Sequence, residues 1–185
     1  MRTKVMLLLM LVAGLAVWAV GAKEKTMAEK TLEVGTKAPG FTAPSSTGKE
    51  ISLDGLKGKI VVLYFYPKDD TPGCTKEACS FRDVNGELQK MGVVVLGVSK
   101  DSMKSHEKFI EKYRLNFPLI SDPEGKIISA YGVWKEKSIF GKTALGVNRS
   151  TFLIGPDGVI RKIWRGVKVE GHDAQVLDAA KKLES

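Results

Sequence analysis

The chain has 185 residues and a formal net charge of +8 at pH 7, with 43% hydrophobic and 27% charged residues. This composition is typical of soluble folded proteins and excludes collagen-like, disordered and fully membrane-embedded classes, while the length allows one ordinary domain. The basic residues are dispersed along the chain and are not interleaved with aromatic residues, so we expect no nucleic-acid binding.

Residues 1–22 have the pattern of an export leader. A short basic stretch with Arg2 and Lys4 precedes an aliphatic run, and residues 20–22 offer small side chains for cleavage. An uncleaved anchor is the alternative, because the apolar stretch reaches the lower limit for a membrane span. We therefore expect a periplasmic or extracytoplasmic protein, attached to the membrane only if this segment is retained.

A flexible tether is predicted at residues 23–33, which are polar and lack hydrophobic periodicity. The folded domain is then expected at residues 34–185. Two short extended segments near 41–42 and 50–53 flank a turn-rich stretch and predict an N-terminal β-hairpin.

A βαβ unit is predicted next. Residues 60–66 are a continuous run of β-branched and aromatic side chains, which is typical of a strand buried on both faces, and Pro67 ends it. A helix is expected from residue 71 or 72 to about residue 90, and residues 93–98 predict a second buried strand.

The alternation of helices and strands continues to the C-terminus. The expected elements are a helix capped by Asp101 or Ser102 and ending near 113, a strand at 118–121, a helix at 126–131, a hairpin of strands 150–154 and 159–164, and a helix at 173–183. Together with the βαβ unit, these elements predict an α/β fold with a mixed sheet between helices.

Cys74 and Cys79 are the only cysteines of the chain. Cys74 falls in the first turn of the predicted helix, where free backbone N–H groups and the helix dipole favour an anion such as a thiolate. Thr71 is short enough to bring a hydroxyl close to this sulfur, and Pro67 stiffens the preceding loop. These positions predict that Cys74 is a reactive nucleophile.

The spacing of the two cysteines predicts a change of conformation. In one regular helix, the Cα atoms of Cys74 and Cys79 lie about 8.7 Å apart. A disulfide needs Cα atoms within about 6.8 Å, so it forms only if the helix unwinds locally. We infer a cycle in which a peroxide oxidises Cys74 to a sulfenic acid, the helix opens, and Cys79 condenses with it. An external dithiol then reduces the disulfide.

Other roles for the cysteines stay open at this stage. A structural disulfide, in a binding or chaperone-like domain without catalytic activity, is usual in exported proteins but would close a very short loop across a helix. An exported thiol-disulfide oxidoreductase would be expected to carry Cys-x-x-Cys, which is absent. The distant His106 and His172 do not complete a recognisable metal-ligand set with the thiols.

The segment around the cysteines resembles the peroxiredoxins, in particular the group called bacterioferritin comigratory protein or peroxiredoxin Q. The family's proline, threonine and peroxidatic cysteine fall on Pro67, Thr71 and Cys74, and the group's resolving cysteine falls on Cys79. A later block is similar to the family segment whose active-site arginine falls on Arg149.

The resemblance extends from about Val34 to the C-terminus and implies a thioredoxin-like fold. It implies a monomeric thiol peroxidase for hydrogen peroxide and organic hydroperoxides, reduced by thioredoxin or a similar dithiol protein, with no metal or organic cofactor. In that role, Arg149 would stabilise the thiolate and orient the peroxide oxygens. Without the resemblance, Arg149 would be interpreted as a surface arginine and Thr71 as a helix cap.

Overall fold

The structure is a computed structural model that describes residues 32–139 and 142–184. The predicted leader at 1–22 and the tether at 23–33, except for its last two residues, lie outside this part of the chain. Within the described residues, no helix is both long enough and apolar enough to cross a membrane.

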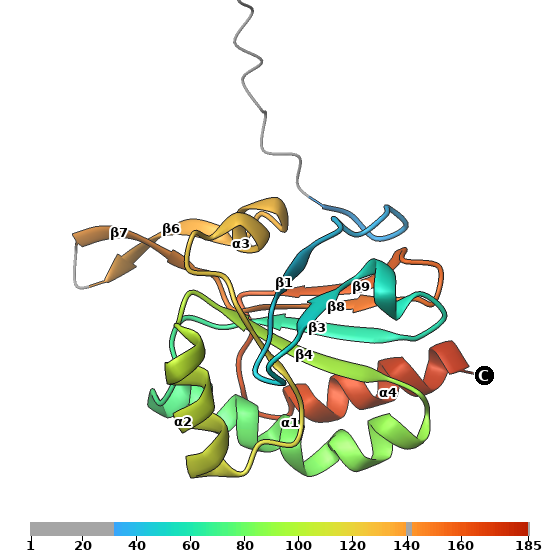
Figure 1. Ribbon diagram of the computed structural model, residues 1–185. Helices are drawn as coiled ribbons and strands as arrows, with labels where there is room; N and C mark the ends of the chain where they lie inside the picture. Colours follow the sequence, from blue (N-terminus) through green and yellow to red (C-terminus); the bar gives the residue numbers. More distant parts are fainter. Residues whose placement is uncertain (1–31, 140–141, 185) are drawn as a thin grey trace, which may run out of the picture.

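A five-stranded mixed sheet forms the centre of the molecule (Figure 1), in the order β5-β4-β3-β8-β9. Its strands are β3 (Val61–Phe65), β4 (Val94–Ser99), β5 (Leu119–Ser121), β8 (Ser150–Ile154) and β9 (Ile160–Arg165). Strands β3, β4 and β5 are parallel, whereas β8 is antiparallel to both β3 and β9. Every residue of β3 is buried, which confirms the predicted central strand.

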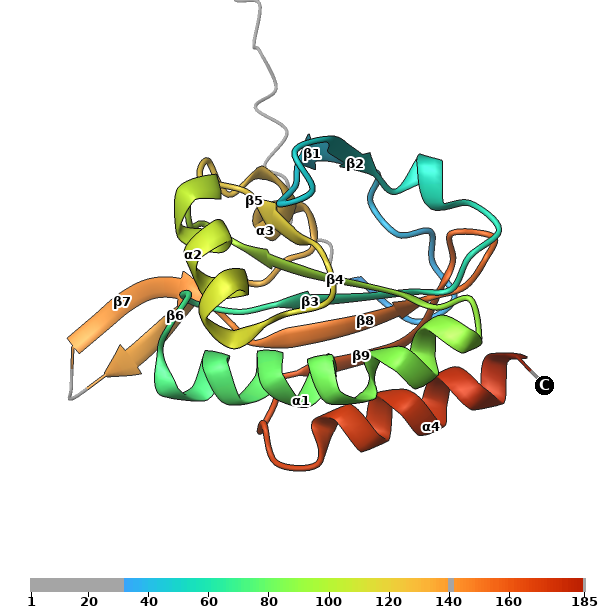
Figure 2. The same ribbon diagram turned by 60° about the horizontal axis from the view of Figure 1, so that its bottom comes forward.

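Helices cover both faces of this sheet. Helices α1 (Pro72–Lys90) and α4 (His172–Glu184) lie side by side on one face (Figure 2) and share one apolar core with it. Helix α2 (Met103–Tyr113) contributes Phe109 to the same core. Helix α3 (Lys126–Ala130) packs into the core on the opposite face. The predicted α/β fold with a mixed sheet between helices is confirmed.

The predicted N-terminal hairpin is present. Strands β1 (Thr42–Pro44) and β2 (Glu50–Ser52) pair in antiparallel fashion, and Ala43 packs into the core that α3 also contacts. A single 3-10 turn, η1 (Asp54–Leu56), follows this hairpin and was not predicted from the sequence.

A second hairpin was missed by the sequence analysis. Strands β6 (Trp134–Ile139) and β7 (Lys142–Val147) form a separate two-stranded sheet that projects from the body of the molecule (Figure 1). Val147 at its base is buried, but Leu145 further out is 59% exposed. Because a projecting hairpin buries no continuous face, it has little of the hydrophobic alternation by which strands are predicted.

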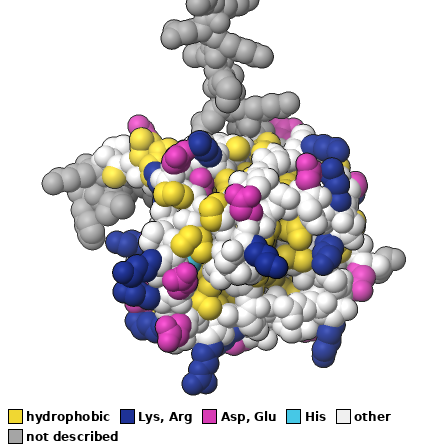
Figure 3. All heavy atoms as spheres, in the orientation of Figure 1, with side chains coloured by type: hydrophobic (Ala, Val, Ile, Leu, Met, Phe, Trp, Pro, Cys, Tyr) yellow, Lys and Arg dark blue, Asp and Glu magenta, His cyan; other side chains and the backbone are white. Residues whose placement is uncertain are grey.

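Charged side chains are dispersed over the face of the molecule seen in Figure 3. Lysine and arginine side chains lie along several edges of this face, and acidic side chains lie among them. The basic residues of this face therefore do not gather into one continuous patch.

Candidate active site

Cys74 is the third residue of α1, in the first helical turn as predicted. Pro72 occupies the first helical position, where a missing N–H is tolerated, and Thr71 before it is extended, with φ −98° and ψ 151°. The helix therefore begins abruptly after the loop that follows β3. The Cys74 side chain faces the sheet and is 2% exposed, in the core that α1 and α4 share.

Arg149 reaches Cys74 because of the way in which β3 and β8 pair. The two strands are antiparallel with Phe65 opposite Ser150, so the residue before β8 lies beside the loop that follows β3. The Nη2 atom of Arg149 is 3.3 Å from the Sγ atom of Cys74. The structure thus joins two of the predicted site residues, which are 75 positions apart in the chain.

Glu77 is the second contact of this guanidinium, because Arg149 Nη1 donates a hydrogen bond to Glu77 Oε2. Glu77 is 2% exposed. Its burial raises the pKa of Glu77 to about 7, although Arg149 favours the ionised carboxylate. Burial works against the charged guanidinium, but Glu77 and Cys74 together outweigh it and raise the pKa of Arg149. A positive charge is therefore held beside the sulfur.

The sequence analysis missed this role of Glu77, although a signal was available. Glu77 follows Cys74 by three residues, so that both side chains lie on one face of α1. A carboxylate at that spacing is a natural partner for any arginine that approaches the cysteine.

The remaining two residues predicted from the loop, Thr71 and Pro67, lie before α1, and neither side chain forms a hydrogen bond with Cys74 within the described part of the chain. The Oγ1 atom of Thr71 donates to the carbonyl of Lys68 at 3.0 Å, and its side chain makes no capping hydrogen bond. Thr71 therefore occupies the N-cap position of α1, as its interpretation as a helix cap expected, but it does so without a side-chain capping hydrogen bond. Pro67 is exposed two residues after the end of β3.

Asp69 anchors this loop from within. Its buried carboxylate accepts hydrogen bonds from Tyr66 Oη and Ser105 Oγ, each at 2.7 Å, and lies 2.9 Å from His106 Nδ1. Ser105 and His106 belong to α2, so the loop is fastened to that helix. His106, which the sequence offered only as a poor metal ligand, therefore has a structural contact with the loop.

Asp70 fastens the same loop to the other end of α2. Its carboxylate forms an ion pair of 2.7 Å with Lys112 Nζ and accepts a hydrogen bond from Tyr113 Oη. The pairing with Lys112 holds the pKa of Asp70 below its usual value. Asp70 adopts the left-handed backbone conformation, with φ 54°, which aspartate tolerates better than most residues.

Cys79 lies in the same helix but on a different face. Helix α1 is continuous from Pro72 to Lys90, so the separation of about 8.7 Å expected in a regular helix applies to the Cα atoms of the two cysteines. Both are free thiols, and the Cys79 side chain is half-buried. Its sulfur lies 3.6 Å from Arg82 Nη1. The structure therefore places both cysteines as predicted but does not bring their sulfurs together.

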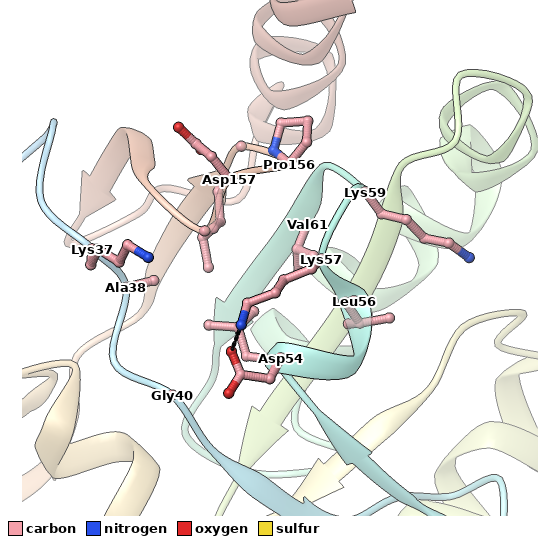
Figure 4. Close-up of a pocket in the computed structure, with 14 residues that line it drawn as sticks. Lys37, Ala38, Gly40, Asp54, Leu56, Lys57, Lys59, Val61, Pro156 and Asp157 are labelled. Carbon is pink, nitrogen blue, oxygen red and sulfur yellow. Dashed lines mark ion pairs between the residues drawn. The ribbon is translucent and has the colours of Figure 1, made fainter.

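A cavity of about 200 Å³ (Figure 4) lies at the end of the central sheet that is opposite to Cys74. It is lined by Val61, the first residue of β3, and by Ile154, the last residue of β8, whereas Cys74 follows the other end of β3. Lys57 in this cavity is paired with Asp54 at 2.8 Å. The cavity is therefore separate from the cysteine site.

No cluster of three or more histidine, cysteine or acidic side chains suited to a metal ion occurs among residues 32–139 and 142–184. The cysteine site itself presents a buried thiol beside an arginine.

The chain is similar to a known protein family and to its curated members. Residues 34–163 match the model of the AhpC/TSA family. A putative peroxiredoxin bcp of Coxiella burnetii is 58% identical over 147 residues, which are 80% of this chain and 97% of the relative. Peroxiredoxin Bcp of Bacillus subtilis is 48% identical over 153 residues, which are 83% of this chain and 98% of the relative.

Solved structures agree with these relatives. A structure of Xanthomonas campestris peroxiredoxin Q is similar with a TM-score of 0.75 and 44% identity, over 78% of this chain and 92% of that one. A structure of Xanthomonas campestris bacterioferritin comigratory protein, reported in connection with its alkyl peroxide reduction activity, has a TM-score of 0.75 and 43% identity over the same shares of the two chains.

Proposed function

Since the chain belongs to the AhpC/TSA family and is a peroxiredoxin, we propose that Cys74 is its peroxidatic cysteine and Cys79 its resolving cysteine. The substrates are hydrogen peroxide and organic hydroperoxides. The observation that carries this assignment is the 3.3 Å contact between Arg149 Nη2 and the Cys74 sulfur, inside the first turn of α1.

In the first step, the Cys74 thiolate attacks the terminal oxygen of the peroxide. A sulfur–oxygen bond forms, the oxygen–oxygen bond breaks, and the departing alkoxide or hydroxide takes up a proton to leave as an alcohol or water. Arg149 supports the thiolate and offers N–H donors to the peroxide oxygens, where negative charge develops. Thr71 is assigned to contact with the bound peroxide, and Pro67 to the rigidity of the loop.

In the second step, the first turns of α1 unwind and Cys79 attacks the sulfenic acid of Cys74. The separation of the cysteines in the intact helix supports this need for local unwinding. The product is a Cys74–Cys79 disulfide, which thioredoxin or a similar dithiol protein reduces by exchange. The enzyme acts as a monomer.

We place the enzyme outside the cytoplasm on the evidence of residues 1–22 alone, whose sequence has the pattern of an export leader. Its reductant must then operate in a compartment that favours disulfides. Cell fractionation of the full chain, with N-terminal sequencing of the recovered protein, tests both the location and the cleavage. Recovery of the intact chain from the cytoplasm would contradict this placement.

The chemical assignment is tested by treating the reduced protein with one equivalent of hydrogen peroxide and following intact mass and free thiols. Wild type should lose both thiols rapidly, Cys79→Ser should retain one added oxygen, and Cys74→Ser should show no fast reaction. If the wild-type protein reacted no faster than free cysteine, Cys74 would not be a peroxidatic residue.

A further inference from the structure

The sulfur atoms of the two cysteines in α1 are each contacted by a different arginine. Arg149 Nη2 lies 3.3 Å from the sulfur of Cys74, and Arg82 Nη1 lies 3.6 Å from the sulfur of Cys79. Five residues of helix turn the two side chains about 140° away from each other, so that they face different surroundings. The peroxide step as described uses Arg149 and leaves Arg82 without a role.

We propose that Arg82 is a catalytic residue of the resolving step, in which it stabilises the Cys79 thiolate that attacks the oxidised Cys74. This inference rests on the peroxidase cycle proposed above. A guanidinium stays protonated at any pH at which the enzyme works, and it donates hydrogen bonds without accepting any, so it favours the anionic form of the sulfur beside it.

The guanidinium of Arg82 is fixed in place by contacts other than Cys79. Its Nη1 atom donates to the carbonyl of Tyr113 at 2.7 Å, and its Nε atom donates to Asp83 Oδ1 at 2.9 Å. The backbone carbonyl of Arg82 accepts a hydrogen bond of 3.1 Å from Asn116 Nδ2. Both the side chain and the backbone of Arg82 are therefore tied to the end of α2 and the residues that follow it.

A further residue of α1, Asn85, also holds the helix to the segment that follows α2. Asn85, which is 1% exposed, donates from Nδ2 to the carbonyl of Asn116 at 2.9 Å. Helix α1 is therefore anchored to the segment after α2 from Arg82 onward. If the helix opens only before this anchor, Cys79 stays three residues from a guanidinium that has not moved, so the Cys79 sulfur can remain near it.

The chemistry of the step balances without another reactant. The electron pair of the Cys79 thiolate forms the new sulfur–sulfur bond, and the sulfur–oxygen bond of the Cys74 sulfenic acid breaks. Hydroxide leaves with that bonding pair and takes up a proton to become water. Because the attacking species is the thiolate, a larger thiolate population at neutral pH makes the step faster.

The test separates the two chemical steps in Arg82→Gln, Arg82→Lys and a charge-matched control, Arg161→Gln, whose side chain pairs with Asp157 away from both cysteines. Each reduced full-length protein is mixed with hydrogen peroxide and quenched at intervals. Mass spectrometry then distinguishes the sulfenic acid, which has gained one oxygen, from the disulfide, which has lost two hydrogens.

We expect Arg82→Gln to form the sulfenic acid as fast as wild type but to form the disulfide about tenfold more slowly at pH 7, since the attacking thiolate has lost the cation beside it. The defect should shrink as the pH approaches about 10, where any such thiol ionises unaided. Arg82→Lys keeps the positive charge, so its rate of disulfide formation should lie between the rates of Arg82→Gln and wild type. The slower variant should also suffer more oxidation of Cys74 to sulfinic acid by excess peroxide.

Disulfide formation could instead be slowed equally at every pH, or equally in Arg82→Lys and Arg82→Gln. Either result would mean that Arg82 only anchors the helix, and would overturn the proposal. Unchanged disulfide formation in Arg82→Gln would do the same. If Arg82→Gln does not fold by circular dichroism, Arg82→Met keeps the apolar stem and is measured in its place. Failure of the wild-type protein to form any sulfenic acid would instead reject the peroxidase cycle itself.

Discussion

The guanidinium of Arg149 lies 3.3 Å from the sulfur of Cys74, although 75 positions separate the two residues in the chain. The same side chain is 15% exposed and is held from the other side by Glu77. A fork-shaped group that contacts a sulfur with one nitrogen and a carboxylate with the other is fixed in orientation, which a single ammonium would not be.

Replacement of this arginine by lysine should therefore damage the first chemical step. Arg149→Lys keeps the positive charge but does not reach Glu77 and Cys74 together, and we expect oxidation of Cys74 to slow by about 10². The measurement is the single-turnover rate of sulfenic acid formation in a Cys79→Ser background. Arg161→Lys on β9 is the matched control, and an equal rate in both variants would show that Arg149 has no part in this step.

The buried Glu77 predicts a particular dependence of stability on pH. Its pKa in the folded protein is about 7, raised from 4.5 mainly by burial. Between these two values, the folded state keeps a proton that the unfolded state has lost, so the free energy of unfolding of wild type falls as the pH rises through this window. In Glu77→Gln the side chain does not titrate, so this pH dependence is absent from the variant. The stability of this variant relative to wild type should therefore increase by about 3 kcal/mol from pH 4.5 to pH 7.

Urea unfolding of both proteins across this range measures the difference directly, and other ionisable groups largely cancel in it. Above about pH 7 the difference should become constant, because Glu77 is then ionised in both states. A difference that did not change between pH 4.5 and pH 7 would show that Glu77 does not hold its proton in the folded protein.

The sequence predicted the elements of the fold better than their arrangement. The continuous apolar run at 60–66 and the proline and glycine signals around it mark β3 and α1, because burial on both faces leaves an unmistakable pattern. The order of strands in the sheet has no such local signal. Nothing in residues 150–154 shows that this strand pairs with β3, and this pairing is what carries Arg149 to Cys74.

For the site as well, the sequence predicted the local position of a residue better than its contacts with distant segments. The place of Cys74 in the first turn of a helix follows from Pro72 and the strand before it, whereas Arg149 was expected only from the resemblance to a known family. The contacts of Glu77 with Arg149 and of Asp69 with His106 depend on which helices and strands lie side by side. Such contacts between distant segments leave no periodic pattern in the sequence, and for Glu77 the spacing of three residues from Cys74 was the one local signal.

Gly73 leaves little space between the start of α1 and Arg149. A Cβ atom added at this position would lie 3.3 Å from Arg149 Nη2, the nitrogen that contacts Cys74. Gly73→Ala should therefore displace the guanidinium by a few tenths of an ångström and slow oxidation of Cys74 roughly 3- to 10-fold. Gly86→Ala in the same helix, where an added Cβ meets nothing within 4 Å, is the control.

Both alanine variants should be at least as stable as wild type, because alanine favours a helix over glycine by up to about 1 kcal/mol. Loss of rate without loss of stability would thus locate the effect at Arg149. Equal peroxide rates in Gly73→Ala and Gly86→Ala would show that the position of this guanidinium tolerates the displacement.

The carboxylate of Asp69 holds the loop before α1 through three side chains, Tyr66, Ser105 and His106. Asp69→Ala leaves these buried polar groups without their shared acceptor, and we expect it to lower the free energy of unfolding by about 3 kcal/mol. Asp69→Asn should cost less, because its amide oxygen still accepts a hydrogen bond. Urea denaturation at pH 7 measures both, with the exposed Asp178→Asn expected to change stability by no more than about 0.5 kcal/mol.

The same replacement should affect the peroxide reaction, since the loop that Asp69 holds leads directly into the turn with Cys74. A loosened loop samples conformations in which the sulfur is not beside Arg149, so the rate of Cys74 oxidation should fall in Asp69→Ala even at temperatures at which the variant is fully folded. If the variant lost stability but kept the wild-type rate, Asp69 would serve the fold alone, and the geometry around Cys74 would be set by α1 and β8 without help from α2.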